Sequence, residues 1–241
     1  MKIACILLTL DRVDLTLQVI KQNFYNSGLD ADVFLVDNGS KDLTPVLTAY
    51  PHFKKVHQFK QNKGIAAAIN KGFEMANSFS SKMSFDLTQT LRPFKYDAIV
   101  TLANDILMPT GWLKAMVEHI KEDTGIIGIH CVEDLPPMVN GVHYADPVFG
   151  NVLITAEAIK RVGKYNTDFD PYGMQDADYN YRVKMAGLKT FYLPGLKSEH
   201  IGHDVGNGSE YRKMKDEGLS KAGKVWQEAQ FRYDESKNYY L

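Results

Sequence analysis

Short β-favouring segments alternate with segments of helical spacing in the first half of the chain, and this alternation limits the fold more than any other feature. The β-favouring runs are residues 2–8, 32–36, 54–59 and 97–102. Apolar residues recur three and four positions apart between these runs, at Val13, Leu17, Ile20 and Phe24 and again at Ile65, Ala68, Ile69 and Phe73. Amphipathic crossovers between largely apolar strands predict right-handed βαβ units. We therefore expect an α/β fold with a parallel sheet in this half.

The second half of the chain is less regular. We expect strands at 125–131, 150–154 and 189–193, a long loop at 133–147, a helix at 176–186 and a charged closing helix at 210–231. Polar residues dominate 78–95, which we interpret as an inserted loop. The whole pattern predicts a single α/β domain whose central sheet is mixed, mainly parallel, and flanked by helices.

Composition excludes several classes of protein. The chain has 241 residues with 44% hydrophobic content, enough for a full core. Its 28 basic residues balance 29 acidic ones, so no global charge favours nucleic acid or an anionic membrane. Cys5 and Cys131 stand in apolar stretches, as buried thiols do. No apolar run approaches the roughly 20 residues of a membrane span, and residues 1–10 are too short for a signal peptide, so we expect a cytoplasmic protein.

Polar residues follow the first two predicted strands, where an α/β sheet binds its ligands. The first strand leads into Thr9, Asp11 and Arg12, and the second leads into Asp37 and Asn38. A carboxylate at such a strand end can accept hydrogen bonds from a nucleobase or a ribose. The alternative is a purely structural turn, in which Asp and Asn cap the backbone.

A second polar loop precedes the helix that begins near Ile65. Lys63 and Gly64 stand just before a helix N-terminus, a good position for meeting an anionic ligand. Residues 66–68 are all Ala, which permits close approach of a ligand or close packing of the helix on the sheet.

Two further segments carry candidate metal ligands. Asn104 and Asp105 follow the fourth predicted strand, where a carboxylate suits Mg²⁺ or Mn²⁺, although a simple N-cap or turn is the alternative. His200 and His203 lie in a glycine-bearing loop that could contact a metal or a diphosphate, whereas an isolated His is usually a surface or core residue.

Gln175, Asp176 and Asp178 stand at the start of the 176–186 helix. Carboxylates two residues apart diverge by roughly 200° around a helix axis, so they cannot face one ligand. One could act as a base and the other could cap the helix or pair with an Arg. The alternative is that both only favour the helix dipole.

In order and spacing, these segments resemble the family 2 glycosyltransferases of the GT-A fold over roughly residues 3–205. The residues that carry the resemblance are Asp37-Asn38-Gly39-Ser40, Asn62-Lys63-Gly64 with Ala66, Asn70 and Gly72, Asn104-Asp105, and Gln175-Asp176-Ala177-Asp178. The resemblance implies an inverting enzyme that uses a nucleoside-diphosphate sugar, with a UDP-sugar favoured, and a divalent cation, Mn²⁺ or Mg²⁺. It implies a nucleotide-sugar-binding half at 1–108, an acceptor half at 109–205 and a helical extension at 206–241.

The resemblance also implies roles for individual residues. The donor nucleotide would be held by Thr9, Asp11, Arg12, Asp37, Asn38, Lys63, Gly64 and Asn104. The metal would be held by Asp105 and His200, and Asp176 would be the catalytic base. The acceptor or the sugar would contact Gln175, Asp178 and His203. The acceptor itself stays open among a polysaccharide, a lipid-linked sugar, a protein and a modified nucleic acid.

Two departures from the family pattern bear on activity. Ala103-Asn104-Asp105 stands where the family often has Asp-x-Asp, and Gln175-Asp176 stands where it often has Glu-Asp. The first removes one carboxylate, and the second leaves the expected base intact. A catalytically inactive nucleotide-sugar-binding module is therefore the alternative function. A nucleotidyltransferase is disfavoured because residues 9–13 lack the glycines of its phosphate loop.

Overall fold

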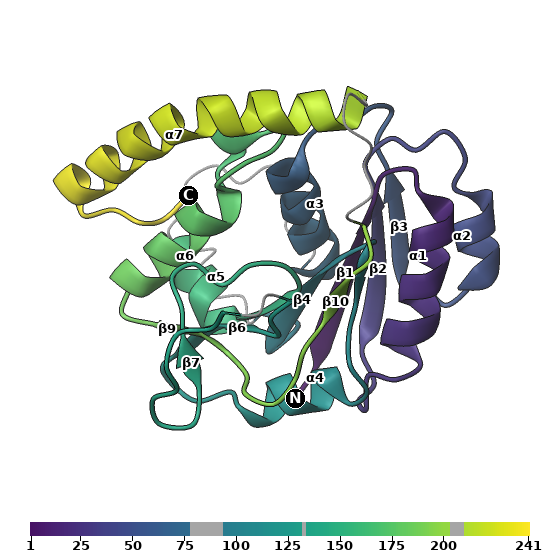
Figure 1. Cartoon of the computed structure of the whole chain (residues 1–241), viewed down its shortest axis with the longest axis horizontal. Coiled ribbons are helices and arrows are strands. Elements are labelled where there is room, and N and C mark those ends of the chain that lie inside the picture. Colours follow the sequence, from purple (N-terminus) through teal and green to yellow (C-terminus); the bar gives the residue numbers. More distant parts are fainter. Residues whose placement is uncertain (78–93, 132–133, 203–209) are drawn as a thin grey trace.

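A computed structural model describes residues 1–77, 94–131, 134–202 and 210–241. Its centre is an eight-stranded sheet in the order β3-β2-β1-β4-β8-β6-β9-β7 (Figure 1). In that order the strands are β3 (Lys55–Gln58), β2 (Asp32–Asp37), β1 (Ile3–Thr9), β4 (Ala98–Ala103), β8 (Val152–Thr155), β6 (Thr124–Gly128), β9 (Lys189–Tyr192) and β7 (His143–Tyr144). Strands β3, β2, β1 and β4 are parallel, as are β6 and β9, whereas β8 and β7 run antiparallel to their neighbours. The expected α/β fold with a mixed, mainly parallel sheet is confirmed.

Helices cover both faces of this sheet. They are α1 (Val13–Val19), which continues as the π-helical turn η1 (Ile20–Phe24), α2 (Thr44–Ala49), α3 (Ile65–Asn77), α4 (Trp112–Glu118), α5 (Ala156–Val162), the 3-10 turn η3 (Thr167–Phe169), α6 (Gln175–Met185) and α7 (Glu210–Ser236). Side chains of β1 alternate between two apolar clusters: Ala4 and Ile6 pack with α3, and Ile3, Cys5 and Leu7 pack with α1 and α4. This alternation follows from the period of two along a strand.

Three short strands are not among the expected ones. Strand β7 falls inside the expected 133–147 loop, and β5 (Ile106–Leu107) pairs antiparallel with β10 (Glu199–His200) in a separate two-stranded sheet. A strand of two residues cannot show a period of two, so its hydrogen-bonding partners alone define it. The β5–β10 pair brings residues 199–200 beside the end of β4.

Helix α7 lies across the ends of α3 and α6 (Figure 1). Its apolar side packs on η3 and α6 through a cluster of Phe169, Ala222, Ala229 and Tyr233. It extends five residues beyond the expected end at 231. No helix among the described residues combines the length and apolar character needed to cross a membrane. Most of the expected 78–95 insertion, at 78–93, and the expected boundary at 205 lie outside the described residues.

Candidate functional site

The ends of β1 and β2 are joined through the carboxylate of Asp37, which is fully buried. Asp37 accepts hydrogen bonds from the Thr9 hydroxyl at 2.9 Å, from the backbone N–H groups of Gly39 at 3.2 Å and Ser40 at 2.9 Å, and from the Ser40 hydroxyl. These bonds satisfy the buried charge and shape the turn after β2. A direct contact of Thr9 or Asp37 with a nucleoside stays a prediction.

Asp11 and Arg12 both adopt left-handed backbone conformations, with φ of 49° and 50°. Such conformations cost non-glycine residues roughly 1 kcal/mol or more each and cluster at functional sites. They turn the chain directly from β1 into α1, where the Arg12 carbonyl accepts the Thr16 N–H at 3.1 Å. The Arg12 guanidinium then lies 3.4 Å from a carboxylate oxygen of Asp105 and 3.3 Å from the Gly202 carbonyl.

Asn38 connects the loop after β2 to the loop before α3. Its Nδ2 donates to the Asn62 Oδ1 at 2.8 Å and to the Gly64 carbonyl at 3.1 Å, and its Oδ1 accepts the Lys63 N–H at 2.8 Å. The Asn38 amide therefore holds the loop, while the Lys63 side chain is exposed to solvent. Contacts of Asn38, Lys63 and Gly64 with a nucleotide stay predictions.

The N-terminus of α3, expected to meet an anionic ligand, already carries an anion from the chain itself. The Asp170 carboxylate accepts the Ala66 N–H at 2.9 Å and the Ala67 N–H at 3.0 Å. Gly64, with φ of +96°, is required here, because a Cβ would overlap the Asp170 carboxylate. Burial raises the pKa of Asp170 to about 6 against the lowering effect of these two bonds. The N–H groups of Ala66 and Ala67 are thus already bound within the chain, and a contact of Lys63 with an anionic ligand stays a prediction. Sequence inspection could not find the cap, since Asp170 lies about a hundred residues beyond the helix.

Asp105, at the end of β4, lies among cationic groups. One of its oxygens is 3.3 Å from the His200 Nε2 and 3.4 Å from Arg12, and its side chain is 15% exposed. Burial would raise the pKa of Asp105, but the hydrogen bond and charge of His200, with the charges of Arg12 and Lys215, outweigh burial and lower it. Asp105 is therefore an ionised carboxylate at neutral pH.

Asn104, the departure beside Asp105, supports the start of α1. Its Nδ2 donates to the Thr16 hydroxyl at 3.0 Å and the Asp11 carbonyl at 3.4 Å. The amide thus ties β4 to the strained turn at Asp11, a role that a carboxylate could not fill because it lacks a donor.

Asp105 and His200 are the described residues that fit a divalent cation. Their oxygen and nitrogen atoms suit Mn²⁺, and a cation held by two protein donors takes its other ligands from phosphate oxygens and water. Over residues 1–77, 94–131, 134–202 and 210–241, no group of three or more His, Cys, Asp or Glu side chains forms a metal site. His203 lies outside the described residues.

Asp176 stands in the first turn of α6, which begins after Met174 in a left-handed conformation. Its side chain is half-buried, and burial raises the pKa of Asp176 to about 7. Gln175 points elsewhere: it is 7% exposed, and its Oε1 accepts the Gly173 N–H at 2.9 Å. Gln175 therefore shapes the turn before the helix, and its contact with an acceptor stays a prediction.

Tyr172 lies near both carboxylates. Burial raises the pKa of the Tyr172 hydroxyl, and so do the negative charges of Asp176 and Asp105. Asp105 and Asp176 therefore both lie close enough to Tyr172 for their charges to affect its hydroxyl, although 71 positions separate them in the sequence. Two hollows in the described surface lie elsewhere, one along α7 beside Asp168 and one at the start of β6 and β9. An enclosing cleft around the carboxylates stays a prediction.

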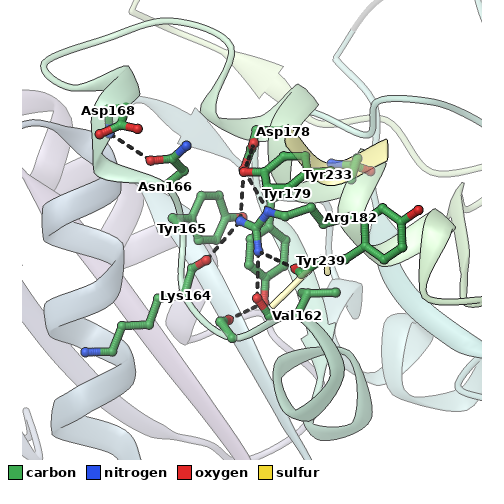
Figure 2. A network of polar contacts seen from close by, with 12 residues as sticks. Val162, Lys164, Tyr165, Asn166, Asp168, Asp178, Tyr179, Arg182, Tyr233 and Tyr239 are labelled. Carbon is green, nitrogen blue, oxygen red and sulfur yellow. Dashed lines mark hydrogen bonds and ion pairs between the residues drawn. The ribbon is translucent and has the colours of Figure 1, made fainter. Parts of the chain in front are cut away.

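Asp178 belongs to a buried network of polar contacts (Figure 2). One carboxylate oxygen accepts the Arg182 Nε at 2.9 Å, and the other accepts the Tyr233 hydroxyl at 2.8 Å. Arg182 also donates to the Val162 carbonyl at 2.6 Å and the Lys164 carbonyl at 2.9 Å. Asp178 is therefore the Arg-pairing residue of the two carboxylates. Because it is 0% exposed, its expected contact with an acceptor is wrong.

The network fastens α6 to its neighbours. Tyr233 comes from α7, and the Arg182 guanidinium also lies 5.0 Å from the centre of the Tyr179 ring. A buried charge held by this many partners has one favourable arrangement. The first turn of α6, which carries Asp176, therefore stands on a rigid helix.

Comparison with known proteins agrees with this architecture. Residues 6–79 match the model of the family described as Glycosyl transferase family 2. No curated protein matches the sequence significantly. Among solved structures, the chain is similar to PcManGT, a mannosyltransferase from Pyrobaculum calidifontis in complex with GDP-Man and Mn²⁺. The TM-score is 0.63 and the sequence identity is 16%, and the match covers 85% of this chain and 58% of PcManGT.

Two other solved structures have similar folds. GalNAc-T7 with UDP, GalNAc and Mn²⁺ has a TM-score of 0.61 and 12% identity, over 83% of this chain and 43% of that one. TarS 1–349 from S. aureus with UDP-GlcNAc has a TM-score of 0.58 and 11% identity, over 89% of this chain and 64% of that one. This chain therefore spans less than two thirds of each of these three structures, and at these identities the likeness concerns the fold, which is of the GT-A kind.

Proposed function

We propose that this chain, whose residues 6–79 match the model of Glycosyl transferase family 2, belongs to that family and is an inverting enzyme that moves a sugar from a nucleoside-diphosphate sugar to an acceptor hydroxyl. One observation carries the proposal. The charges of Asp105 and Asp176 both raise the pKa of Tyr172, while the pKa of Asp105 is lowered by its cationic neighbours and that of Asp176 is raised by burial. Two nearby carboxyl groups with diverging pKa values are typical of a divided chemical task.

Asp176 is the proposed general base. A pKa of about 7 lets the carboxylate accept a proton near neutral pH, and no described residue donates a hydrogen bond that would tie up its oxygens. The acceptor oxygen attacks the anomeric carbon from the face opposite the diphosphate, so the configuration inverts. Proton transfer to a placed carboxylate contributes about 10² to 10⁴ in rate.

Asp105 and His200 are the proposed ligands of a divalent cation. Bound Mn²⁺ or Mg²⁺ would supply positive charge to the leaving diphosphate. The PcManGT and GalNAc-T7 structures both contain Mn²⁺, which supports this choice. Arg12, 3.4 Å from Asp105, would place a further positive charge beside the phosphates.

The nucleoside is proposed to lie over the ends of β1 and β2. Asp11 is exposed there, in the turn that Ser40 holds through a hydrogen bond of 2.6 Å to the Asp11 N–H. A UDP-sugar is the favoured donor, in agreement with the UDP in the GalNAc-T7 structure and the UDP-GlcNAc in the TarS structure. A GDP-sugar is the second candidate, because the PcManGT structure contains GDP-Man.

The test compares wild type with Asp176→Asn, and the exposed Asp134→Asn controls for the loss of one negative charge. Nucleoside diphosphate released from a panel of UDP- and GDP-sugars with Mn²⁺ is measured with and without candidate acceptors. We expect Asp176→Asn to bind the donor normally but to lose transfer by about 10² or more. Normal turnover by that variant would remove Asp176 from the role of base. Donor binding by wild type without release beyond slow hydrolysis would favour the non-catalytic module.

A further inference from the structure

We infer that α7 belongs to the donor site and that Lys215 on this helix binds the diphosphate together with Arg12. The inference rests on the proposed function, because it adds a residue to the same site. Lys215 belongs to a helix whose alternating charges predict a solvated surface, so its pattern gives no sign of this role.

Three close contacts fix the first half of α7 over the site. A Cβ on Gly218 would overlap the Tyr172 carbonyl, which shows how closely the helix backbone approaches the segment before α6. Leu219 and Ala222 lie against Gly173 in the same segment. On the other side, the Met214 sulfur is 3.3 Å from the Asn62 Nδ2, in the loop before α3. The helix thus bridges the two loops that flank the proposed nucleotide.

Lys215 projects from this bridge toward Tyr172 and the charge of Asp105. Its Nζ lies 4.7 Å from the centre of the Tyr172 ring, a cation–π contact with the residue that both Asp105 and Asp176 influence. Burial lowers the pKa of Lys215, the charge of Asp105 opposes that shift, and the charge of Arg12 adds to it. These effects place the ammonium group in the same electrostatic neighbourhood as Asp105 and Arg12.

The charges in this neighbourhood favour an anion. Asp105 contributes one negative charge, whereas Arg12 and Lys215 contribute two positive ones, and Asn104 stands where a second carboxylate is common in the family. A surplus of positive charge in a partly buried position attracts phosphate oxygens. Lys supplies a compact point charge, and Arg supplies a planar group that can contact two oxygens.

This arrangement gives Lys215 a defined part in the transfer. The bond between the anomeric carbon and the phosphate oxygen breaks, and its electron pair stays on the diphosphate. The acceptor oxygen forms the new bond to that carbon, and its proton passes to Asp176. Negative charge therefore grows on the leaving phosphate, where a positioned ammonium group stabilises it.

The experiment measures binding of UDP, GDP, uridine and guanosine by calorimetry, each with and without Mn²⁺, to four forms of the full chain. The forms are wild type, Lys215→Ala, Lys215→Arg and the control Lys224→Ala, whose side chain on the same helix is 84% exposed. For the nucleoside diphosphate that binds wild type, we expect Lys215→Ala to weaken binding about tenfold, or about 1.4 kcal/mol. The loss should persist without Mn²⁺, Lys215→Arg should restore most of it, and nucleoside affinity should not change.

Two results would overturn the inference. If Lys215→Ala binds the diphosphate as tightly as Lys224→Ala does, Lys215 does not contact the phosphates. If the substitution weakens nucleoside and diphosphate equally, α7 only maintains the shape of the site. Failure of wild type to bind any of the four ligands would instead reject the proposed function, and the inference with it. Thermal unfolding midpoints of the four forms distinguish lost binding from lost folding.

Discussion

Replacing Asp176 by Asn is expected to stabilise the folded chain at alkaline pH while it abolishes transfer. Folding raises the pKa of Asp176 from 3.8 to about 7, because burial penalises the charged carboxylate. The folded state therefore holds the proton more tightly than the unfolded state does. Consequently, stability falls as the pH rises from about 4 to about 7, and the full penalty is present above that range.

The size of the gain follows from this pKa difference. Each pH unit between the two pKa values corresponds to about 1.4 kcal/mol, which gives an upper limit of about 4 kcal/mol. Because the side chain is only half-buried, solvent screening reduces this, and we expect about 2 kcal/mol. Asparagine fits the same volume and carries no charge. The variant should thus unfold at higher urea concentration than wild type near pH 8, with a gain below about 1 kcal/mol near pH 5.

Urea unfolding of wild type, Asp176→Asn and Asp134→Asn at both pH values provides the measurement. Equal stability of Asp176→Asn and wild type near pH 8 would show that burial does not raise the pKa of Asp176. The physical reason for assigning the base to Asp176 would then be lost. A gain shared by Asp134→Asn would show instead that reduced net charge is the cause.

Three further outcomes are expected. The transfer rate at subsaturating substrate should rise with pH and level off above about 7, because the base must lose its proton; a profile flat from pH 5 to 8 would contradict an Asp176 pKa of about 7. Arg182→Met should cost about 3 to 5 kcal/mol in urea unfolding, since it leaves Asp178 buried and unpaired, and a cost below about 1 kcal/mol would argue against the network. Gly202→Ala should reduce transfer at least tenfold in a coupled nucleoside-diphosphate assay, because the new Cβ would overlap the Asp105 carboxylate. Unchanged activity would show that Asp105 can move without loss of transfer, which contradicts a fixed position for this carboxylate.

The sequence predicts those parts of the fold that repeat a local pattern. The spacing of Ile65, Ala68, Ile69 and Phe73 predicts a helix, and α3 covers Ile65–Asn77. The fourth predicted strand, 97–102, nearly coincides with β4 at Ala98–Ala103. Each of these elements is long enough for its apolar residues to show a period, and the period determines which face packs on the core.

Features that depend on distant partners are not visible in the sequence. The proximity of Asp105 and His200 depends on β5 and β10, which are two residues long. Whether Asp178 or Asp176 faces the site depends on Arg182 and on Tyr233 from α7, and a spacing argument shows only that the two carboxylates diverge. The sequence could therefore predict that the two residues differ in role, but only their packing assigns Asp178 to the interior.

The dispersal of the site along the chain has a consequence for folding. Arg12 follows the first strand and His200 belongs to the last, yet both contact Asp105, which lies between them in sequence. Pairings of such long range form late, because closing the intervening loops costs entropy before any contact is gained. A partly folded chain can thus build β1, β2 and α1 without the proposed ion-binding centre, so affinity for the proposed donor would report on the last folding step.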